Sequence, residues 1–192
     1  STIAYPYCWK ECEVLDNGPL RFTAKLIYNP LVIKGDSNVV ETRVISLDKG
    51  SQLNKTVISY TDLKEVTPIV AGIVIHKENP TGYSFDSNAG YIAYADSTQN
   101  PRNNNGVIYV GAVFPASLNA AKAQLFPEAE RKEHGGALGH VLGISDYEPG
   151  TEYVYYWGSG WSKYGFAADT EWTKYLENFA QQVRNPLTVT VK

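Results

Sequence analysis

Short runs of alternating apolar and polar residues, separated by turn residues, constrain the fold of this sequence most strongly. In one such run, Leu20, Phe22 and Ala24 alternate with Arg21 and Thr23. A period of two residues is typical of a half-buried β-strand. The pattern predicts about nine strands, over Leu20–Tyr28, Val39–Leu47, Leu53–Tyr60, Ile69–His76, Tyr91–Ala95, Val107–Phe114, Leu138–Ser145, Tyr153–Trp157 and Leu187–Val191.

The turns between these runs predict how the strands are arranged. Asp48-Lys49-Gly50 joins two runs and is expected to close a β-hairpin, because glycine readily adopts the positive φ such turns need. Ile69–His76 is nearly all apolar, which predicts a central strand covered on both faces. Many strands with few helices favour an all-β fold, an antiparallel β-sandwich.

One amphipathic helix is predicted near the C-terminal end. Asp169 or Thr170 can cap its start, and Asn185-Pro186 is expected to end it. Ser117–Glu133 is expected to hold a second, shorter helix or a long exposed loop. The length of 192 residues corresponds to a single domain, residues 1–192. The apolar stripe of the C-terminal helix consists of Trp172, Tyr175, Leu176, Phe179, Ala180 and Val183.

Charge and composition exclude several classes of function. The net charge is -3 and no run of Lys or Arg occurs, so nucleic acid is not expected as a partner. No apolar run reaches membrane-spanning length. Cys8 and Cys12 are four residues apart, which lacks the paired spacing of a zinc site. We expect two buried or half-buried thiols there.

A row of aromatic residues is the strongest candidate for ligand binding. Tyr153, Tyr155 and Trp157 fall on one side of a predicted strand, and Gly158-Ser159-Gly160 then leads to Trp161. Such a row can fill a β-core, or it can offer flat faces to a sugar, since rings contact C–H patches while phenol and indole groups bind hydroxyls. Both interpretations stay open from the sequence.

Two sets of segments resemble known families. Asn17–Arg21, Glu41–Arg43 and Leu47–Asn54 are similar to paired strands of galactose-mutarotase-like supersandwich domains, which also occur in polysaccharide lyases. Tyr155–Lys163, together with several earlier segments, resembles a secreted bacterial family of unknown function that accompanies enzymes degrading pectin and other polyuronates. These earlier segments are Val70–Lys77, Gly90–Tyr94, Ile108–Gly111 and Phe114-Pro115.

The resemblance covers nearly the whole chain and implies four expectations. The fold is expected to be a supersandwich, of which this chain is the C-terminal portion. A second chain is a candidate to complete that sandwich. The expected location is extracytoplasmic, either periplasmic or secreted. The expected ligand is an acidic oligosaccharide or polysaccharide that contains uronate.

Polyuronate elimination needs a base, an acid and a group that stabilises negative charge. His76 and His140 are the predicted catalytic residues, since histidine titrates near neutral pH. Each has an equally ordinary interpretation as a hydrogen-bonded structural histidine. Arg43 and Lys77 are predicted to bind the uronate carboxylate, while Tyr155, Trp157 and Trp161 shape the sugar subsites. The same residue types serve dehydration, so elimination and dehydration stay open.

Other functions fit the sequence less specifically. Glycoside hydrolysis requires two facing carboxylates, and the sequence contains no recognisable paired-carboxylate motif. No metal site is predicted, because no His-x-His or His-x-x-x-His pair occurs. No cofactor is predicted, although a divalent cation would stabilise negative charge as Arg or Lys does. The alternative to a lyase-like or dehydratase-like enzyme is a non-catalytic glycan-binding or assembly module.

Overall fold

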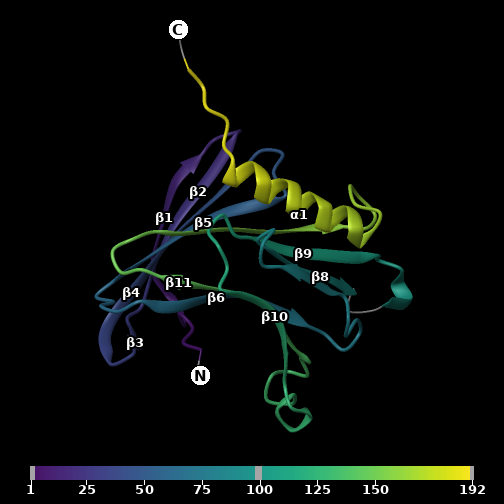
Figure 1. Cartoon of the computed structure of the whole chain (residues 1–192), viewed down its shortest axis with the longest axis horizontal. Coiled ribbons are helices and arrows are strands. Elements are labelled where there is room, and N and C mark those ends of the chain that lie inside the picture. Colours follow the sequence, from purple (N-terminus) through teal and green to yellow (C-terminus); the bar gives the residue numbers. More distant parts are fainter. Residues whose placement is uncertain (1–2, 98–100, 191–192) are drawn as a thin grey trace. The chain divides into compact units, whose positions relative to one another are not determined.

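The structure, a computed structural model, describes residues 3–97 and 101–190 of the chain (Figure 1). Within them the fold is mostly antiparallel β-sheet with one α-helix, α1 (Asp169–Arg184), so the predicted all-β fold with a C-terminal helix is confirmed. Two short 3-10 helices, η1 (Pro101–Asn103) and η2 (Glu128–Glu130), complete the elements. The strands are β1 (Trp9–Asn17), β2 (Arg21–Tyr28), β3 (Leu31–Ile33), β4 (Asp36–Asp48), β5 (Leu53–Thr61), β6 (Thr67–Ile75), β7 (Tyr83–Asp86), β8 (Tyr91–Ser97), β9 (Val107–Val113), β10 (Ala120–Leu125), β11 (Gly139–Tyr147) and β12 (Tyr153–Trp161).

The chain divides into two compact units. Unit 1 takes the chain up to Ile69 together with Asp146–Tyr156, and unit 2 takes Val70–Ser145 and the chain from Trp157 on. Strand β12 contributes its first four residues to unit 1 and the rest to unit 2. That the whole chain forms a single domain stays a prediction.

Unit 1 is an antiparallel sheet in the order β1-β2-β4-β5, with β3 paired to β4. The predicted hairpin is confirmed: β4 pairs with β5 so that Glu41 lies opposite Tyr60 and Arg43 opposite Ile58. On the other side of β4, Arg43 lies opposite Leu26 of β2. Residues that face one another across strands point to the same face of the sheet. The register therefore gathers residues from three strands on one face.

Unit 2 is a β-sandwich with a helix on one outer face. One sheet contains β9, β8 and β7, and the other has the order β10-β11-β6. Ala93 of β8 pairs with Gly111 of β9, so these two residues share a face, whereas Tyr94 points the opposite way. The Tyr94 hydroxyl accepts a hydrogen bond from the His76 amide at 3.0 Å, which places the three-stranded sheet on that side.

Helix α1 covers the other face of this sheet, because its apolar stripe packs on β9 and β8 (Figure 1). Trp172, Leu176 and Ala180 are fully buried. A Cβ at Gly111 would lie 2.6 Å from Leu176 Cδ1, so only glycine permits this close approach. The helix begins without a side-chain cap at Ala168, and the Glu171 carboxylate instead accepts from the Ala167 amide at 2.7 Å.

Several predictions about elements were wrong. Residues 117–133 form β10 and η2 rather than a second, shorter helix or a long exposed loop, since β10 pairs with β11 from Ala120 to Leu125. Strand β6 stands at one end of the three-stranded sheet and is partly exposed, so it is not a central strand. Residues 187–190 form no strand, and Val191 lies outside the described residues.

The N-terminal strand was also missed, and the predicted burial of the thiols was wrong. Strand β1 pairs only on one side, with β2, and all its residues are exposed. Cys8 and Cys12 are therefore exposed, and both are free thiols. The Asn29 side-chain amide donates to Cys8 Sγ at 3.2 Å.

Candidate functional site

A cluster of polar side chains lies on one face of the unit 1 sheet. Strand β4 supplies Glu41 and Arg43, which share a face because they are two residues apart. Tyr60 comes from β5 directly opposite Glu41, and the first part of β12 adds Tyr155. With Tyr28 of β2, these five residues form what we call the Arg43 cluster.

Glu41 forms the buried base of the cluster. Its side chain is 2% exposed, and its carboxylate accepts three hydrogen bonds. Arg43 Nε donates to Oε1 at 2.8 Å, Arg43 Nη2 donates to the same oxygen, and the Tyr60 hydroxyl donates to Oε2 at 2.8 Å. A buried carboxylate is tolerated only when it is paired in this way. Glu41 therefore holds Arg43 in one position.

Arg43 connects this base to the surface. Its side chain is 24% exposed, and its guanidinium carbon lies 5.2 Å from the centre of the Tyr28 ring. Burial opposes the charged form, but Glu41, Tyr155 and Tyr28 outweigh it, so the pKa of Arg43 lies above its ordinary value. The guanidinium is thus a permanent, positioned cation that can bind a carboxylate.

The phenols of Tyr60 and Tyr155 stay protonated. Burial is the main reason why the pKa of Tyr155 is raised, with Arg43 acting in the opposite direction. Burial and then the Glu41 carboxylate raise the pKa of Tyr60 further above its ordinary range. A protonated phenol donates hydrogen bonds and can deliver a proton to a leaving oxygen. The cluster therefore combines a cation with proton donors.

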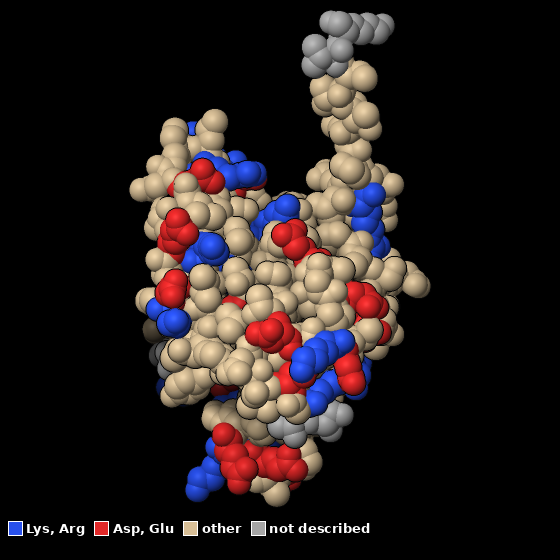
Figure 2. Space-filling view, turned by 90° about the vertical axis from the view of Figure 1, so that its left-hand side faces the viewer, with Lys and Arg blue, Asp and Glu red and all other residues tan. Residues whose placement is uncertain are grey.

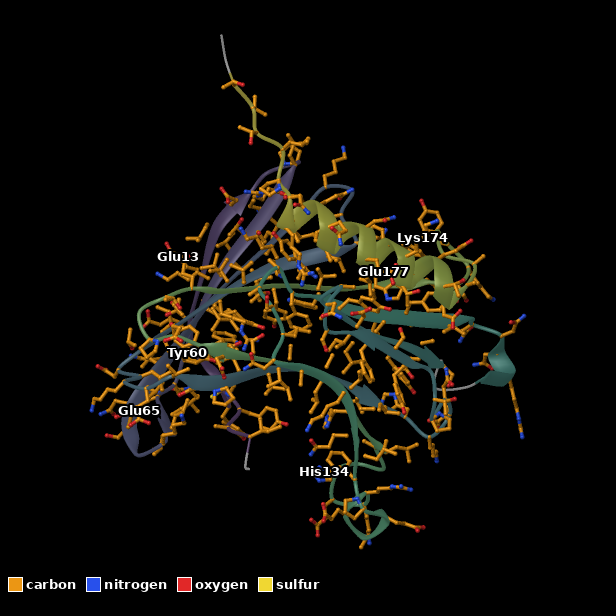
Figure 3. All side chains as sticks on the ribbon, in the orientation of Figure 1. Glu13, Tyr60, Glu65, His134, Lys174 and Glu177 are labelled. Atoms are coloured by element: carbon orange, nitrogen blue, oxygen red, sulfur yellow. The ribbon has the colours of Figure 1, made fainter. Side chains whose placement is uncertain are left out.

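Tyr60 (labelled in Figure 3) is itself held by Tyr147. The two rings meet edge to face, with centroids 4.9 Å apart. The Tyr60 amide donates to the Tyr147 hydroxyl at 3.0 Å, and that hydroxyl donates to the Thr151 carbonyl at 2.7 Å. These contacts fix the ring that donates to Glu41, so the buried side of the cluster is rigid.

In unit 2, His76 forms a second site of acid–base character. Its Nδ1 lies 3.0 Å from Asp96 Oδ1, and its side chain is 46% exposed. An ionised carboxylate only accepts hydrogen bonds, so the proton of the neutral imidazole lies on Nδ1 and leaves the other ring nitrogen basic. His76, the predicted catalytic residue that directly follows strand β6, therefore has a carboxylate beside it that orients its ring.

His140 has a different environment within unit 2. It lies on β11 opposite Gln124 of β10, and its ring meets the Phe126 ring edge to face at 5.2 Å. His134, labelled on the loop in Figure 3, stacks on the same Phe126 ring at 3.8 Å. Burial, followed by His134, lowers the pKa of His140. The contacts of His140 are thus aromatic, whereas His76 contacts a carboxylate.

The remaining predicted residues are exposed. Trp157 and Trp161 are 40% and 44% exposed, whereas Tyr153 is 6% exposed. The aromatic row therefore contributes to the core at its start and offers surface rings at its end. Trp161 Nε1 donates to the Asn105 carbonyl at 2.7 Å, which fixes its indole. Lys77 lies on the surface, with its Nζ 4.0 Å from Glu78 Oε1.

Sequence reasoning missed four residues of these sites. Glu41 and Tyr60 could have been found, because the hairpin register places them opposite each other once the turn at Asp48–Gly50 is fixed. Tyr28 follows from the register of the next pair of strands. Asp96 is twenty residues from His76, and nothing in the local pattern indicates that contact.

Neither positive nor negative charge predominates on the face seen in Figure 2. Acidic and basic side chains are interspersed there, and acidic ones gather on the projecting loop at its lower end. Within the described residues no group of three or more His, Cys, Asp or Glu side chains could hold a metal ion. In the same residues, no helix has the length and apolar character to cross a membrane.

Comparison with known proteins gives one match. The model of a protein family described as a domain of unknown function (DUF4861) matches residues 1–189. No curated protein matches the chain, and no solved structure matches it.

Proposed function

The chain belongs to the DUF4861 family, whose description assigns no activity, and we therefore propose a function from the Arg43 cluster: action on acidic, uronate-containing oligosaccharides. The proposed reaction is β-elimination or dehydration beside the uronate carboxylate. One observation carries the proposal. The buried Glu41 carboxylate positions a partly exposed guanidinium that has Tyr28 and Tyr155 beside it.

Elimination needs a base, a proton donor and a cation, and the Arg43 cluster offers the last two. A base removes the proton on the carbon next to the uronate carboxylate, and that electron pair forms a carbon–carbon double bond. The bond from the next carbon to its oxygen breaks, and the departing oxygen receives a proton. A cation at the carboxylate stabilises the negative charge of the intermediate. Arg43 supplies that cation, and the protonated Tyr155 is a proton donor.

We propose His76 and His140 as further acid–base groups, with His76 the stronger candidate. Asp96 orients the imidazole of His76 through Nδ1, which leaves the other ring nitrogen free to act as a general base on a partly exposed side chain. Lys77 and the exposed indoles of Trp157 and Trp161 are proposed to contact the sugar chain. The family resemblance supports two further parts of the proposal, an extracytoplasmic location and a supersandwich-like arrangement. Both fit a substrate of this class.

The test is an assay of the intact chain with polyuronate oligosaccharides, including pectin fragments. New ultraviolet absorbance reports double bonds, and the mass of the products separates cleavage from loss of water. We expect turnover by the wild type and a loss of about a hundredfold in Arg43→Gln, since a positioned charge at the developing anion typically contributes that much. Arg21→Gln is the matched control, because Arg21 is an exposed arginine of the same sheet.

Arg43→Gln leaves Glu41 buried without its counter-ion, so the variant could lose turnover because it fails to fold. Such a loss would be mistaken for a catalytic effect. The double variant Glu41→Gln/Arg43→Gln removes both charges and is expected to be folded but inactive. His76→Ala and His140→Ala test the two imidazoles separately. Full activity of the folded double variant, or no turnover of any polyuronate by the wild type, would contradict the proposal.

A second candidate is a non-catalytic glycan-binding module. The observation in its favour is the fixed, exposed indole of Trp161 near the exposed Trp157, since such rings bind sugars without chemistry. Binding of the same oligosaccharides with no change of mass over long incubation would favour the module over the enzyme.

A further inference from the structure

A cavity in unit 2 lies between the beginning of α1 and the sheet strands β7, β8 and β9. Its volume is about 200 Å³. Pockets for drug-sized ligands occupy about 300–1,000 Å³, so this one suits a single ring rather than a longer molecule. None of the residues proposed above for uronate chemistry lines it.

The walls of the cavity are aromatic. The rings of Tyr91, Tyr109 and Trp172 line it, from two strands and the helix. Space is left between them because Ala95 lies opposite Tyr109 on the neighbouring strand. The remaining lining includes hydroxyl side chains, among them Thr170 and Thr173 on the first turns of α1. Rings combined with hydroxyls suit a ligand that has both C–H patches and hydroxyl groups.

Trp172 contributes an unsatisfied donor to this region. Its side chain is 1% exposed, and Nε1 is buried with no hydrogen-bond partner. Nε1 lies against Gly111, two residues along β9 from the Tyr109 of the cavity wall. A buried donor without an acceptor costs about 1–3 kcal/mol, so a ligand oxygen within reach would be strongly preferred.

Carboxylates surround the cavity. Asp169 lines it, and after burial the charges of Asp169 and Glu171 contribute to the raised pKa of Tyr109. On the other side, burial and then Glu177 raise the pKa of Tyr91. Carboxylates accept hydrogen bonds from sugar hydroxyls, but they repel a carboxylate ligand. This electrostatic environment is opposite to that of Arg43.

We propose that this cavity is a binding site for one neutral sugar ring. Aromatic walls, hydroxyl groups, an unpaired indole donor and acidic neighbours all favour an uncharged polyhydroxyl ligand. A quaternary ammonium group would also suit aromatic walls, but the group itself has no atom that can accept a hydrogen bond from Trp172 Nε1. The site does not depend on the uronate chemistry proposed for unit 1.

Two-dimensional ¹H–¹⁵N NMR of the intact chain tests this site directly. The chain has four tryptophans, and Trp172→Phe identifies the indole resonance of Trp172. The probes are methyl glycosides of neutral hexoses and pentoses, with galacturonate and choline as charged comparisons. We expect at least one neutral glycoside to shift the Trp172 resonance saturably, with a Kd of about 1 mM for so small a ligand.

Tyr109→Ala is expected to weaken this binding about tenfold, since it removes one aromatic wall. Tyr164→Ala is the matched control, because Tyr164 belongs to the same unit, is 78% exposed and does not line the cavity. The other three indole resonances show whether Tyr109→Ala is folded. In Asp169→Asn, which keeps the size of the side chain, galacturonate is expected to bind about threefold tighter while neutral glycosides bind as before.

The inference is overturned if no neutral glycoside shifts the Trp172 resonance at about 50 mM, far above the expected Kd. It is equally overturned if choline or galacturonate binds the wild type more tightly than every neutral glycoside. Turnover of polyuronates is measured separately, so failure of one proposal leaves the other to be judged on its own result.

Discussion

Among the single residues of unit 1, Glu41 is the one whose burial depends most on its hydrogen-bond partners. Its carboxylate is almost completely buried, and its three hydrogen bonds come from Arg43 and Tyr60. Pairs of this kind gain little over apolar residues, but removal of one partner leaves a buried charge uncompensated. The arrangement is therefore better explained by the positioning of Arg43 than by stability.

This view predicts the stability of Glu41 and Arg43 variants. Glu41→Gln is expected to lower the free energy of unfolding by about 2 kcal/mol, below the range for fully buried pairs because Arg43 is partly exposed. The double variant Glu41→Gln/Arg43→Gln should recover most of that loss, since neither charge remains. Urea unfolding measures both, and Asp48→Asn in the exposed Arg21–Asp48 pair should leave the midpoint unchanged. Additive effects of the two single changes would contradict the coupling.

The candidate residues differ in how far the sequence could predict them. Arg43 and Tyr155 were both predicted and lie in one cluster. The hairpin register, a local rule, places Arg43 beside Glu41 and Tyr60, whereas Tyr155 joins them because β12 lies next to β5. The partner of His76 depends on which strands of the sandwich come together, and no local rule determines that. How deeply each aromatic residue from Tyr153 to Trp161 is buried likewise depends on which elements pack against it, and alternation does not predict that.

At the level of elements, α1 is fastened at its end by Arg184. The guanidinium donates to three backbone carbonyls: Nε to Pro115 at 3.2 Å, Nη1 to Asn88 at 2.6 Å and Nη2 to Phe114 at 3.0 Å. Gly90 adopts a φ of +79° beside this anchor. A Cβ there would lie 2.0 Å from Arg184 Nη2 and 2.8 Å from the Phe114 carbonyl oxygen.

Substitution of two glycines separates backbone strain from this close contact. Gly150 has the same φ of +79°, but a Cβ there would meet nothing within 4 Å. Gly150→Ala is expected to cost about 1 kcal/mol from the conformation alone. Gly90→Ala should cost about 2 kcal/mol more, because the new Cβ displaces the Arg184 anchor. Thermal and urea unfolding of the two variants measure the difference, and equal losses would show that the contact is unimportant.

Elements were predictable where the apolar period and the flanking turn residues agreed. The hairpin of β4 and β5 shows alternation and a turn, helix α1 shows a helical period and a terminating Asn185-Pro186, and both were predicted close to their observed bounds. Strand β10 was missed because Ala120–Leu125 has weak alternation and is stabilised by its pairing with β11. A strand was predicted from Leu187 because an apolar pattern was present, but residues 187–190 have no neighbouring strand to pair with.

Across the whole molecule, buried tyrosines govern the response to alkaline pH. Burial is the first cause of a raised pKa at a group of tyrosines that includes Tyr60, Tyr91, Tyr94, Tyr109, Tyr155 and Tyr156. In the unfolded chain these phenols ionise near the ordinary value of 10.0. Above that pH the unfolded state loses protons that the folded state keeps, so stability falls as pH rises.

We therefore expect the urea midpoint to be nearly constant up to about pH 9 and to fall steeply above about pH 10. Ultraviolet absorbance of phenolate should show the exposed tyrosines ionising first and the buried ones only as the chain unfolds. Tyr60→Phe should reduce the alkaline loss, whereas Tyr7→Phe should not, because Tyr7 is 94% exposed. Smooth ionisation of all 14 phenols near the ordinary pKa, with no change of stability, would contradict this expectation.

The exposed thiols at the start of the chain have a practical consequence. Cys8 and Cys12 are the only cysteines, and both are accessible at one margin of unit 1. Maleimide dyes will therefore label the natural sequence at that margin without engineering, and the dyes will report on the environment of β1. For the same reason, air oxidation will couple chains through this strand when no reductant is present.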